Sequence, residues 1–291
     1  MLLKKPVFII GTGRSGSTVF ADLLRTHPEF SYMTTLSHRY PYNPNLNRQI
    51  LNLMRLPVFG KYVENKFGLS EAYPFWDSLF RGFSQSTREL NSNDVTEKVR
   101  KSVIDGITSI MVPKRDKFIS KITGWPRIGF LHEIFPDAKF VHIVRDGRDV
   151  ACSLIQTTFW RGWQGPHNWR LGLLPEEYEA EWKRNDNSYV ILAGIFWKII
   201  LDSIDNISST LPTNQFIEIR YEDFVKDPTK YSDHIFQQLG MPLYTNKMEK
   251  ISNLLAIKDR GNRWKKDLNS QQTKLITESL ESHLVNRGYT I

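Results

Sequence analysis

Apolar residues along the chain gather into short continuous runs, which alternate with stretches where apolar residues recur every three or four positions. Short runs are typical of buried parallel strands, and the wider spacing predicts helices with one buried face. The runs cover residues 7–10, 29–33, 117–123, 138–144 and 215–220. The helical spacing begins at Ser17 and returns over 93–111, 126–135, 146–157, 188–211 and 229–239. This alternation predicts an α/β fold, in which a parallel sheet is flanked by helices in three layers.

Two stretches, at about 37–90 and 159–187, interrupt the alternation. The first loses its periodicity among prolines and aromatic residues, and the second is rich in tryptophan. We expect a single domain over residues 1–291, in which these irregular or helical insertions form a lid over a ligand pocket. A loop at 258–267 lies among the helices predicted for the tail.

The stretch that follows the first predicted strand, residues 11–18, reads Gly-Thr-Gly-Arg-Ser-Gly-Ser-Thr. Its glycines allow a tight turn and a close approach to a ligand, and the free N–H groups of the following helix favour an anion. The spacing fits both a dinucleotide fingerprint and a P-loop. Glu29, however, lies at the start of the second predicted strand and not at its end, and Arg14 replaces the lysine of P-loop triphosphatases. We therefore expect a phosphate-binding loop without that lysine.

A second group of cations follows the predicted strand at 138–144. Arg145 stands at the carboxyl end of this strand, the edge where ligands of open α/β sheets bind. P-loop triphosphatases use an aspartate on the comparable strand to hold Mg²⁺. Ser153 lies eight residues further on, about two helical turns, and can share the same face. The pattern predicts two bound anionic groups without a metal, whereas Arg148 and Asp149 fit plain pairing with neighbouring charges.

Composition and charge narrow the class of protein only partly. The net charge of +8 suits an anionic ligand, a nucleic acid or an acidic surface. The single cysteine, Cys152, predicts no internal disulfide and a reducing compartment. The start has no signal-peptide pattern, and the longest apolar stretch, 190–201, is too short to span a bilayer. We expect a cytoplasmic protein without stable membrane insertion, and the histidines lack the spacing of a metal site.

Four blocks, at 11–18, 135–153, 220–228 and 261–267, resemble in their order the sulfotransferases that use 3′-phosphoadenosine 5′-phosphosulfate (PAPS). The stretch Glu71-Ala-Tyr-Pro-Phe-Trp and the tryptophan-rich insertion are similar to a bacterial-type branch of that P-loop superfamily. The resemblance covers most of the chain. It implies an enzyme that moves a sulfuryl group in line from PAPS to a hydroxyl of a small-molecule, lipid or saccharide acceptor. The nucleotide product would be 3′-phosphoadenosine 5′-phosphate (PAP), and no metal would be used.

The resemblance also implies roles for particular residues. The 5′-phosphosulfate would be held by Arg14, Ser15, Gly16, Ser17 and Thr18. Arg145 and Ser153 would hold the 3′-phosphate, with Tyr221 near the adenine and with Arg263 and Trp264 closing over the nucleotide. Arginine suits bidentate phosphate contacts, and an indole stacks well on a purine.

Transfer also requires a cation for the leaving oxygen and a base for the acceptor's proton. Arg14 is our candidate for the first task, which Lys121 can share. The glutamate of protein-tyrosine sulfotransferases and the histidine of cytosolic sulfotransferases have no counterpart here. Two bases remain: Glu71, whose aromatic neighbours would make it a stronger base, and His38, because imidazoles titrate near neutral pH.

Two other classes of protein fit parts of this pattern. A P-loop small-molecule kinase would use ATP and Mg²⁺, and a non-enzymatic nucleic-acid-binding protein would explain the charge and the aromatic residues. The second lacks a known binding motif, and its cations form two loop clusters instead of one face. We expect a small-molecule hydroxyl acceptor and no nucleic acid. The aromatic insertions suggest an apolar or ring-bearing alcohol, phenol or sugar.

Overall fold

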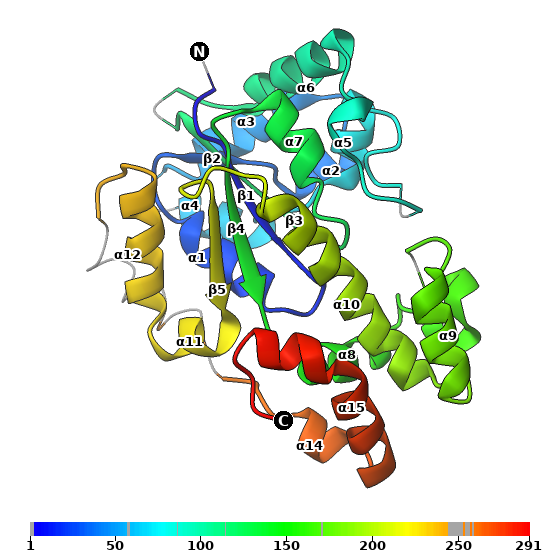
Figure 1. Cartoon of the computed structure of the whole chain (residues 1–291). Coiled ribbons are helices and arrows are strands. Elements are labelled where there is room, and N and C mark those ends of the chain that lie inside the picture. The colour runs from blue at the N-terminus through cyan, green and yellow to red at the C-terminus, as the bar shows by residue number, and fades with distance from the viewer. Residues whose placement is uncertain are drawn as a thin grey trace.

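A five-stranded parallel sheet with the order β2-β3-β1-β4-β5 lies at the centre of this computed structural model (Figure 1). Each strand forms within one residue of a run predicted from the sequence, so these predictions are confirmed. The strands are β1 (Val7–Gly11), β2 (Phe30–Tyr32), β3 (Lys117–Thr123), β4 (Lys139–Val144) and β5 (Phe216–Arg220). The structure describes residues 3–56, 59–85, 87–113, 115–169, 171–243, 253, 257 and 259–291.

Side chains on the two faces of the sheet pack into two cores, because successive residues of a strand point to opposite sides. Phe8 and Ile10 of β1 enter one core, and Val7 and Ile9 enter the other. The first core is covered by α5 (Tyr73–Leu79), α6 (Glu97–Ile110), α7 (Ile128–Ile134), α8 (Gly147–Ile155), α10 (Tyr189–Ser208) and α15 (Ser270–Asn286). The second is covered by α1 (Ser17–Leu24), α3 (Pro44–Leu53), α11 (Tyr221–Lys226) and α12 (Pro228–Gln238). The predicted three-layer α/β fold is confirmed.

Helix α10 accounts for the longest apolar stretch of the sequence. It contacts both α8 and α15, and all its residues from Val190 to Leu201 are buried. Lys198 is the charged exception: its Nζ lies 2.5 Å from Oε2 of Glu181 and 4.9 Å from the centre of the Tyr178 ring. Across the described ranges, no helix combines the length and the apolar character that crossing a bilayer requires.

The first insertion is more regular than its fading periodicity predicts. It contains α2 (Thr35–Arg39), α3, α4 (Gly60–Lys66) and α5, so it is mostly helical, which is one of the two forms expected for the insertions. Pro44 and Pro74 lie in the first turns of α3 and α5, where proline starts a helix and costs no hydrogen bond. Because these helices are short, each has too few turns to show a clear helical periodicity of apolar residues in the sequence.

The second insertion is mostly irregular, as expected. Its regular elements are two 3₁₀ turns, η2 (Gly162–Gln164) and η3 (Pro166–Asn168), followed by α9 (Glu176–Arg184). The remaining short elements of the chain are η1 (Ser92–Asp94) and α14 (Trp264–Asp267). Lys258, the first residue of the loop predicted in the tail, lies outside the described residues.

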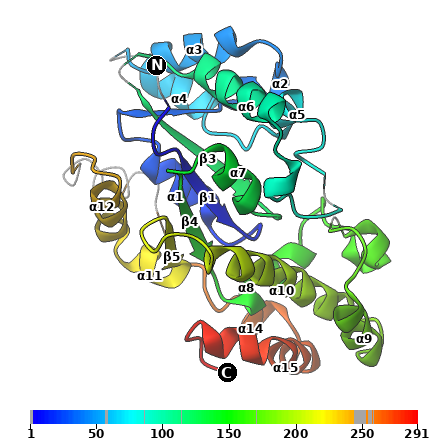
Figure 2. The same ribbon diagram turned by 45° about the horizontal axis from the view of Figure 1, so that its top comes forward.

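The sheet order places the two predicted cation clusters beside each other. Strands β1 and β4 are neighbours, paired from Val7 with Lys139 to Ile10 with His142. Their carboxyl ends therefore bring the loop at 12–16 and Arg145 to one edge, where open parallel sheets bind ligands. Figure 2 shows the helices of the first insertion at one end of the molecule and α14 and α15 at the other.

Candidate active site

The loop between β1 and α1 uses left-handed backbone at two positions. Arg14 has φ 73° and Gly16 has φ 88°. Gly16 caps the start of α1, and a Cβ at this position would lie 2.3 Å from Cδ2 of Tyr221. Glycine is needed here for two reasons: other residues are strained at this φ, and the tyrosine ring fills the space beside it.

We expect Gly16→Ala to destabilise the protein. The left-handed backbone would cost about 1–2 kcal/mol with a Cβ, and displacing the buried ring of Tyr221 would cost about 1–3 kcal/mol. Chemical denaturation would measure the loss in the free energy of unfolding. Gly13→Ala is the matched control, because a Cβ on Gly13 meets nothing within 4 Å. Equal stability of the two variants would contradict the tight contact with Tyr221.

A cavity of about 250 Å³, here called the smaller cavity, joins the two cation clusters. Arg14 and Arg145 both line it, and Nη1 of Arg145 donates to the carbonyl oxygen of Arg14 at 3.2 Å. Nε of Arg14 also donates to Oγ of Ser153 at 2.9 Å. Other residues that line it are Gly16, Ser17, Thr18, Tyr221, Arg260 and Arg263. Ser15 lines neither of the cavities described here and is fully buried.

Arg145 is held rigidly at the wall of the smaller cavity. Its guanidinium lies 4.6 Å from the centre of the Tyr221 ring, and Nη2 donates to the carbonyl oxygen of Arg260 at 2.6 Å. Nη2 is also 3.7 Å from Oδ2 of Asp149. Its Nε is buried and has no hydrogen-bond partner among the described residues. At least one donor of this permanent cation is thus left without a partner by the described part of the chain.

Asp149 ties the late loop to α8. Its carboxylate accepts from the backbone N–H groups of Asn262 at 2.8 Å, Arg263 at 2.9 Å and Trp264 at 3.3 Å. Burial raises the pKa of Asp149, and the neighbouring Arg145 opposes that rise. Because the aspartate lies one helical turn after Arg145, it fixes the late loop against the same end of β4.

Trp264, which the resemblance assigns to the nucleotide, packs on a neighbouring arginine. Its ring is buried and packs 4.3 Å from the guanidinium of Arg148, and it does not line the smaller cavity. Arg148 in turn pairs with Asp146 at 2.7 Å, as expected of a structural charge. Arg263 does reach the smaller cavity, with its Nη2 2.9 Å from Oδ2 of Asp267.

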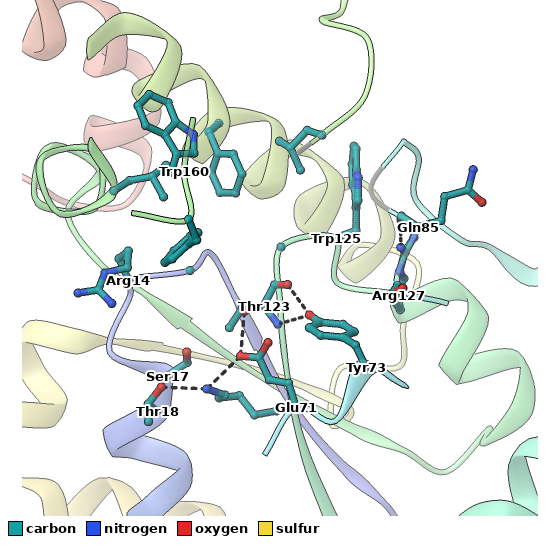
Figure 3. A pocket seen from close by; sticks show the side chains of 18 residues that line it. Arg14, Ser17, Thr18, Glu71, Tyr73, Gln85, Thr123, Trp125, Arg127 and Trp160 are labelled. Atoms are coloured by element: carbon teal, nitrogen blue, oxygen red, sulfur yellow. Dashed lines mark hydrogen bonds and ion pairs between the residues drawn. The ribbon is translucent and has the colours of Figure 1, made fainter. Parts of the chain in front are cut away.

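A second cavity, of about 610 Å³ and here called the larger cavity, adjoins the same loop (Figure 3). Arg14, Ser17 and Thr18 line both cavities, so the loop forms a wall common to the two. One side of the larger cavity is apolar and includes Leu154, Phe159, Trp160, Leu171 and Phe196. The other side is polar and includes Glu71, Lys121, Thr123, Ser84, Gln85 and Arg127.

Glu71 and Lys121 form a hydrogen-bonded chain that leads to the loop. Oε1 of Glu71 lies 3.0 Å from Nζ of Lys121, which donates to Oγ1 of Thr18 at 2.9 Å. The same oxygen of Glu71 accepts from Oγ1 of Thr123 at 3.0 Å. The hydrogen-bond partners of this carboxylate are thus an ammonium and a hydroxyl, which the sequence did not predict. Tyr73 lies next to it but donates to the carbonyl oxygen of Thr123 at 2.7 Å.

His38 is a further predicted site residue that lies away from the cavities. It lies exposed on α2 and lines neither cavity. Sequence reasoning in turn missed Thr123 and Arg127, which do line the larger cavity. Thr123 ends β3, and its place at the carboxyl edge of the sheet was a usable signal. No pattern in the sequence marks Arg127.

The fold and the two cavities define a class of protein, and comparison with known proteins identifies it. The family model described as "Sulfotransferase family" matches residues 6–246, and the chain belongs to this family. Among the described residues, no group of three or more His, Cys, Asp or Glu side chains is placed to hold a metal ion.

Particular relatives come from mycobacteria. The chain is 25% identical over 282 residues to omega-hydroxy-beta-dihydromenaquinone-9 sulfotransferase Stf3 of Mycobacterium bovis and of Mycobacterium tuberculosis. The match covers 86% of this chain and 66% of the length of each relative. The fold is similar to that of sulfotransferase STF9 from Mycobacterium avium, with a TM-score of 0.63, 16% identity and coverage of 100% of this chain and 79% of that one. Sulfotransferase STF1 from M. tuberculosis has a TM-score of 0.54 at 15% identity, with coverage of 97% and 77%.

Proposed function

We propose that this sulfotransferase takes its sulfuryl group from PAPS and that the nucleotide occupies the smaller cavity. The observation that carries the proposal is the convergence of Arg14 and Arg145, from two separate strand ends, on that one cavity. A nucleotide with phosphate groups at both its 5′ and 3′ positions matches two clusters of cations. The buried Nε of Arg145, without a partner among the described residues, supports a bound anion at this point.

In this proposal Arg14, Gly16, Ser17 and Thr18 hold the 5′-phosphosulfate, with the N–H groups at the start of α1 aimed at it. Ser15 is not proposed for this task, because it is fully buried and lines neither cavity. Arg145 and Ser153 hold the 3′-phosphate, Tyr221 lies by the adenine, and Arg263 closes over the nucleotide. Trp264 is not proposed for this task, because its ring packs on Arg148 outside the cavity.

The acceptor enters the larger cavity in this proposal. Its hydroxyl oxygen attacks sulfur as its proton passes to Glu71, and the bond from sulfur to the bridging oxygen of the 5′-phosphate breaks. PAP leaves with the electron pair of that bond, and Arg14 and Lys121 stabilise the negative charge on its oxygen. Lys121 is placed for this because its Nζ contacts both Glu71 and Thr18.

We further propose that residues 1–291 form one domain and that the two insertions complete the acceptor pocket. The first insertion contributes Glu71 and Gln85 to the larger cavity, and the second contributes Phe159 and Leu171. The apolar side supports a small-molecule acceptor with an apolar or ring-bearing body and a hydroxyl directed toward Glu71.

Calorimetric titration with PAP tests the donor directly. We expect PAP to bind in buffer that contains a metal chelator, and we expect ATP with Mg²⁺ to bind at least tenfold more weakly. Transfer of labelled sulfate from PAPS to hydroxylated compounds then tests the reaction. Binding of ATP that depends on Mg²⁺ would favour a P-loop kinase. Strong, salt-sensitive binding of random oligonucleotides would favour a nucleic-acid-binding protein.

A further inference from the structure

A buried cation lines the larger cavity away from the shared loop. The side chain of Arg127 is 3% exposed, and Figure 3 shows it beside Gln85, on the opposite side of the view from Arg14. Neither the phosphate loop nor the chain formed by Glu71 and Lys121 uses it. Burying a permanent charge is costly, so its position beside a cavity requires an explanation.

The guanidinium is held in one orientation by the first insertion. Nη1 donates to the carbonyl oxygen of Arg88 at 2.6 Å, and Nη2 donates to the carbonyl oxygen of Gln85. The backbone N–H of Arg127 donates to Oε1 of Glu89 at 2.8 Å, with Arg127 itself in the left-handed region at φ 57°. Two of the five N–H groups of the guanidinium are thus engaged, and the group cannot swing away without breaking these bonds.

The guanidinium of Arg127 has only a long ion pair with the described residues. Among the described residues, Glu89 is the only carboxylate within 4.0 Å of it, at 3.9 Å. Burial raises the pKa of Glu89 to about 7, and this weakens Glu89 as a counter-charge, although Arg127 itself opposes the rise. The adjacent Arg88 and its partner Asp94 also act on Arg127, in opposite directions. Asp77, the other nearby acid of the insertion, accepts from the backbone and hydroxyl of Ser84.

We infer that Arg127 binds a carboxylate of the acceptor, so that the acceptor is a hydroxy acid with its two functional groups at different places in the larger cavity. The hydroxyl faces Glu71 and Lys121, the carboxylate pairs with Arg127 beside Gln85, and an apolar body between them packs on Phe159 and Leu171. A guanidinium suits a carboxylate because both are planar and form parallel hydrogen bonds. This inference rests on the proposed function and names the substrate class of the same site.

Matched ligands test the inference. The panel consists of ω-hydroxy fatty acids of graded length and of phenolic acids, each with its primary amide, which keeps the shape but carries no charge. Binding to the PAP-saturated enzyme is measured by calorimetry, and sulfate transfer is measured from labelled PAPS. We expect at least one acid to bind and react, with affinity about 10- to 100-fold higher than that of its amide.

Substitutions of Arg127 then distinguish binding of the acceptor's carboxylate from support of the neighbouring loop. Arg127→Gln should bring the preference for acid over amide close to one, and Arg127→Lys, which keeps the charge, should retain most of it. Arg88→Gln is the matched control: Arg88 is an exposed arginine of the neighbouring loop that does not line the cavity, so its loss should leave the preference unchanged. If Arg127→Gln fails to fold, the wild type and Arg127→Lys still report the preference.

The inference is overturned if the wild type treats acids and amides alike, if no acid binds, or if Arg127→Gln keeps the preference. PAP binding by the same samples distinguishes these outcomes from failure of the proposed function. If the enzyme binds PAP but shows no preference for carboxylates, the proposed donor stands and only the inferred acceptor class is rejected.

Discussion

Arg145→Ala is expected to weaken PAP binding by on the order of 100-fold or more. Truncating one member of a buried, hydrogen-bonded charge pair costs about 2–5 kcal/mol, most of it from the partner left behind. Here the variant removes the cation from the bound phosphate and also releases the carbonyl oxygens of Arg14 and Arg260. Calorimetry with PAP gives the affinity, and thermal unfolding shows how much of each sample is folded.

Arg148→Ala is the control for this experiment. Arg148 lies three residues further on, is equally buried and pairs with Asp146, but it does not line the smaller cavity. We expect both variants to be less stable than the wild type. Among folded molecules, only Arg145→Ala should bind PAP much more weakly. Affinity within threefold of the wild type in folded Arg145→Ala would remove this residue from the phosphate site.

Glu71→Gln is expected to lower the turnover of labelled sulfate transfer by about 10²–10⁴-fold, the usual contribution of a positioned base. Glutamine keeps the oxygen that accepts from Lys121 and Thr123, so the geometry of the site should survive while its basicity is lost. PAP affinity should change little, because Glu71 lines only the larger cavity. The measurement is the initial rate with saturating PAPS.

His38→Gln provides the comparison, since both residues are bases indicated by the sequence. His38 is exposed on α2 and lines neither cavity, so this variant should turn over at the wild-type rate. A loss of rate in His38→Gln together with a normal rate in Glu71→Gln would reverse the assignment. A normal rate in both would mean that neither residue takes the proton.

The sheet and the phosphate loop could be predicted because their signals are local. Runs of buried residues identify the strands, and the glycines before Ser17 identify the turn into α1. The strand order could not be read from the chain, yet it is the pairing of β1 with β4 that brings Arg14 beside Arg145. Residues predicted at the ends of strands therefore came together as expected.

The sequence could not predict the contacts that depend on tertiary structure. Glu71 follows four short helices, and nothing near it in sequence shows that Lys121 of β3 will be its partner. Trp264 was assigned to the nucleotide from its place in a motif, but its ring packs on Arg148 of α8. Arg127 is buried by loops that precede it by about forty residues. These contacts join segments that are far apart in the sequence, and their relative positions are set only when the chain folds.

The aspartate at position 149 has a thermodynamic consequence for how the nucleotide is captured. Ordering a flexible residue costs about 1–2 kcal/mol of backbone entropy. Residues 262–264 are already fastened to α8 through their backbone N–H groups, so their share of this cost is met during folding. If the donor binds as proposed, it would meet a loop that is already ordered. More of the attraction between its phosphates and the arginines would then remain as net affinity.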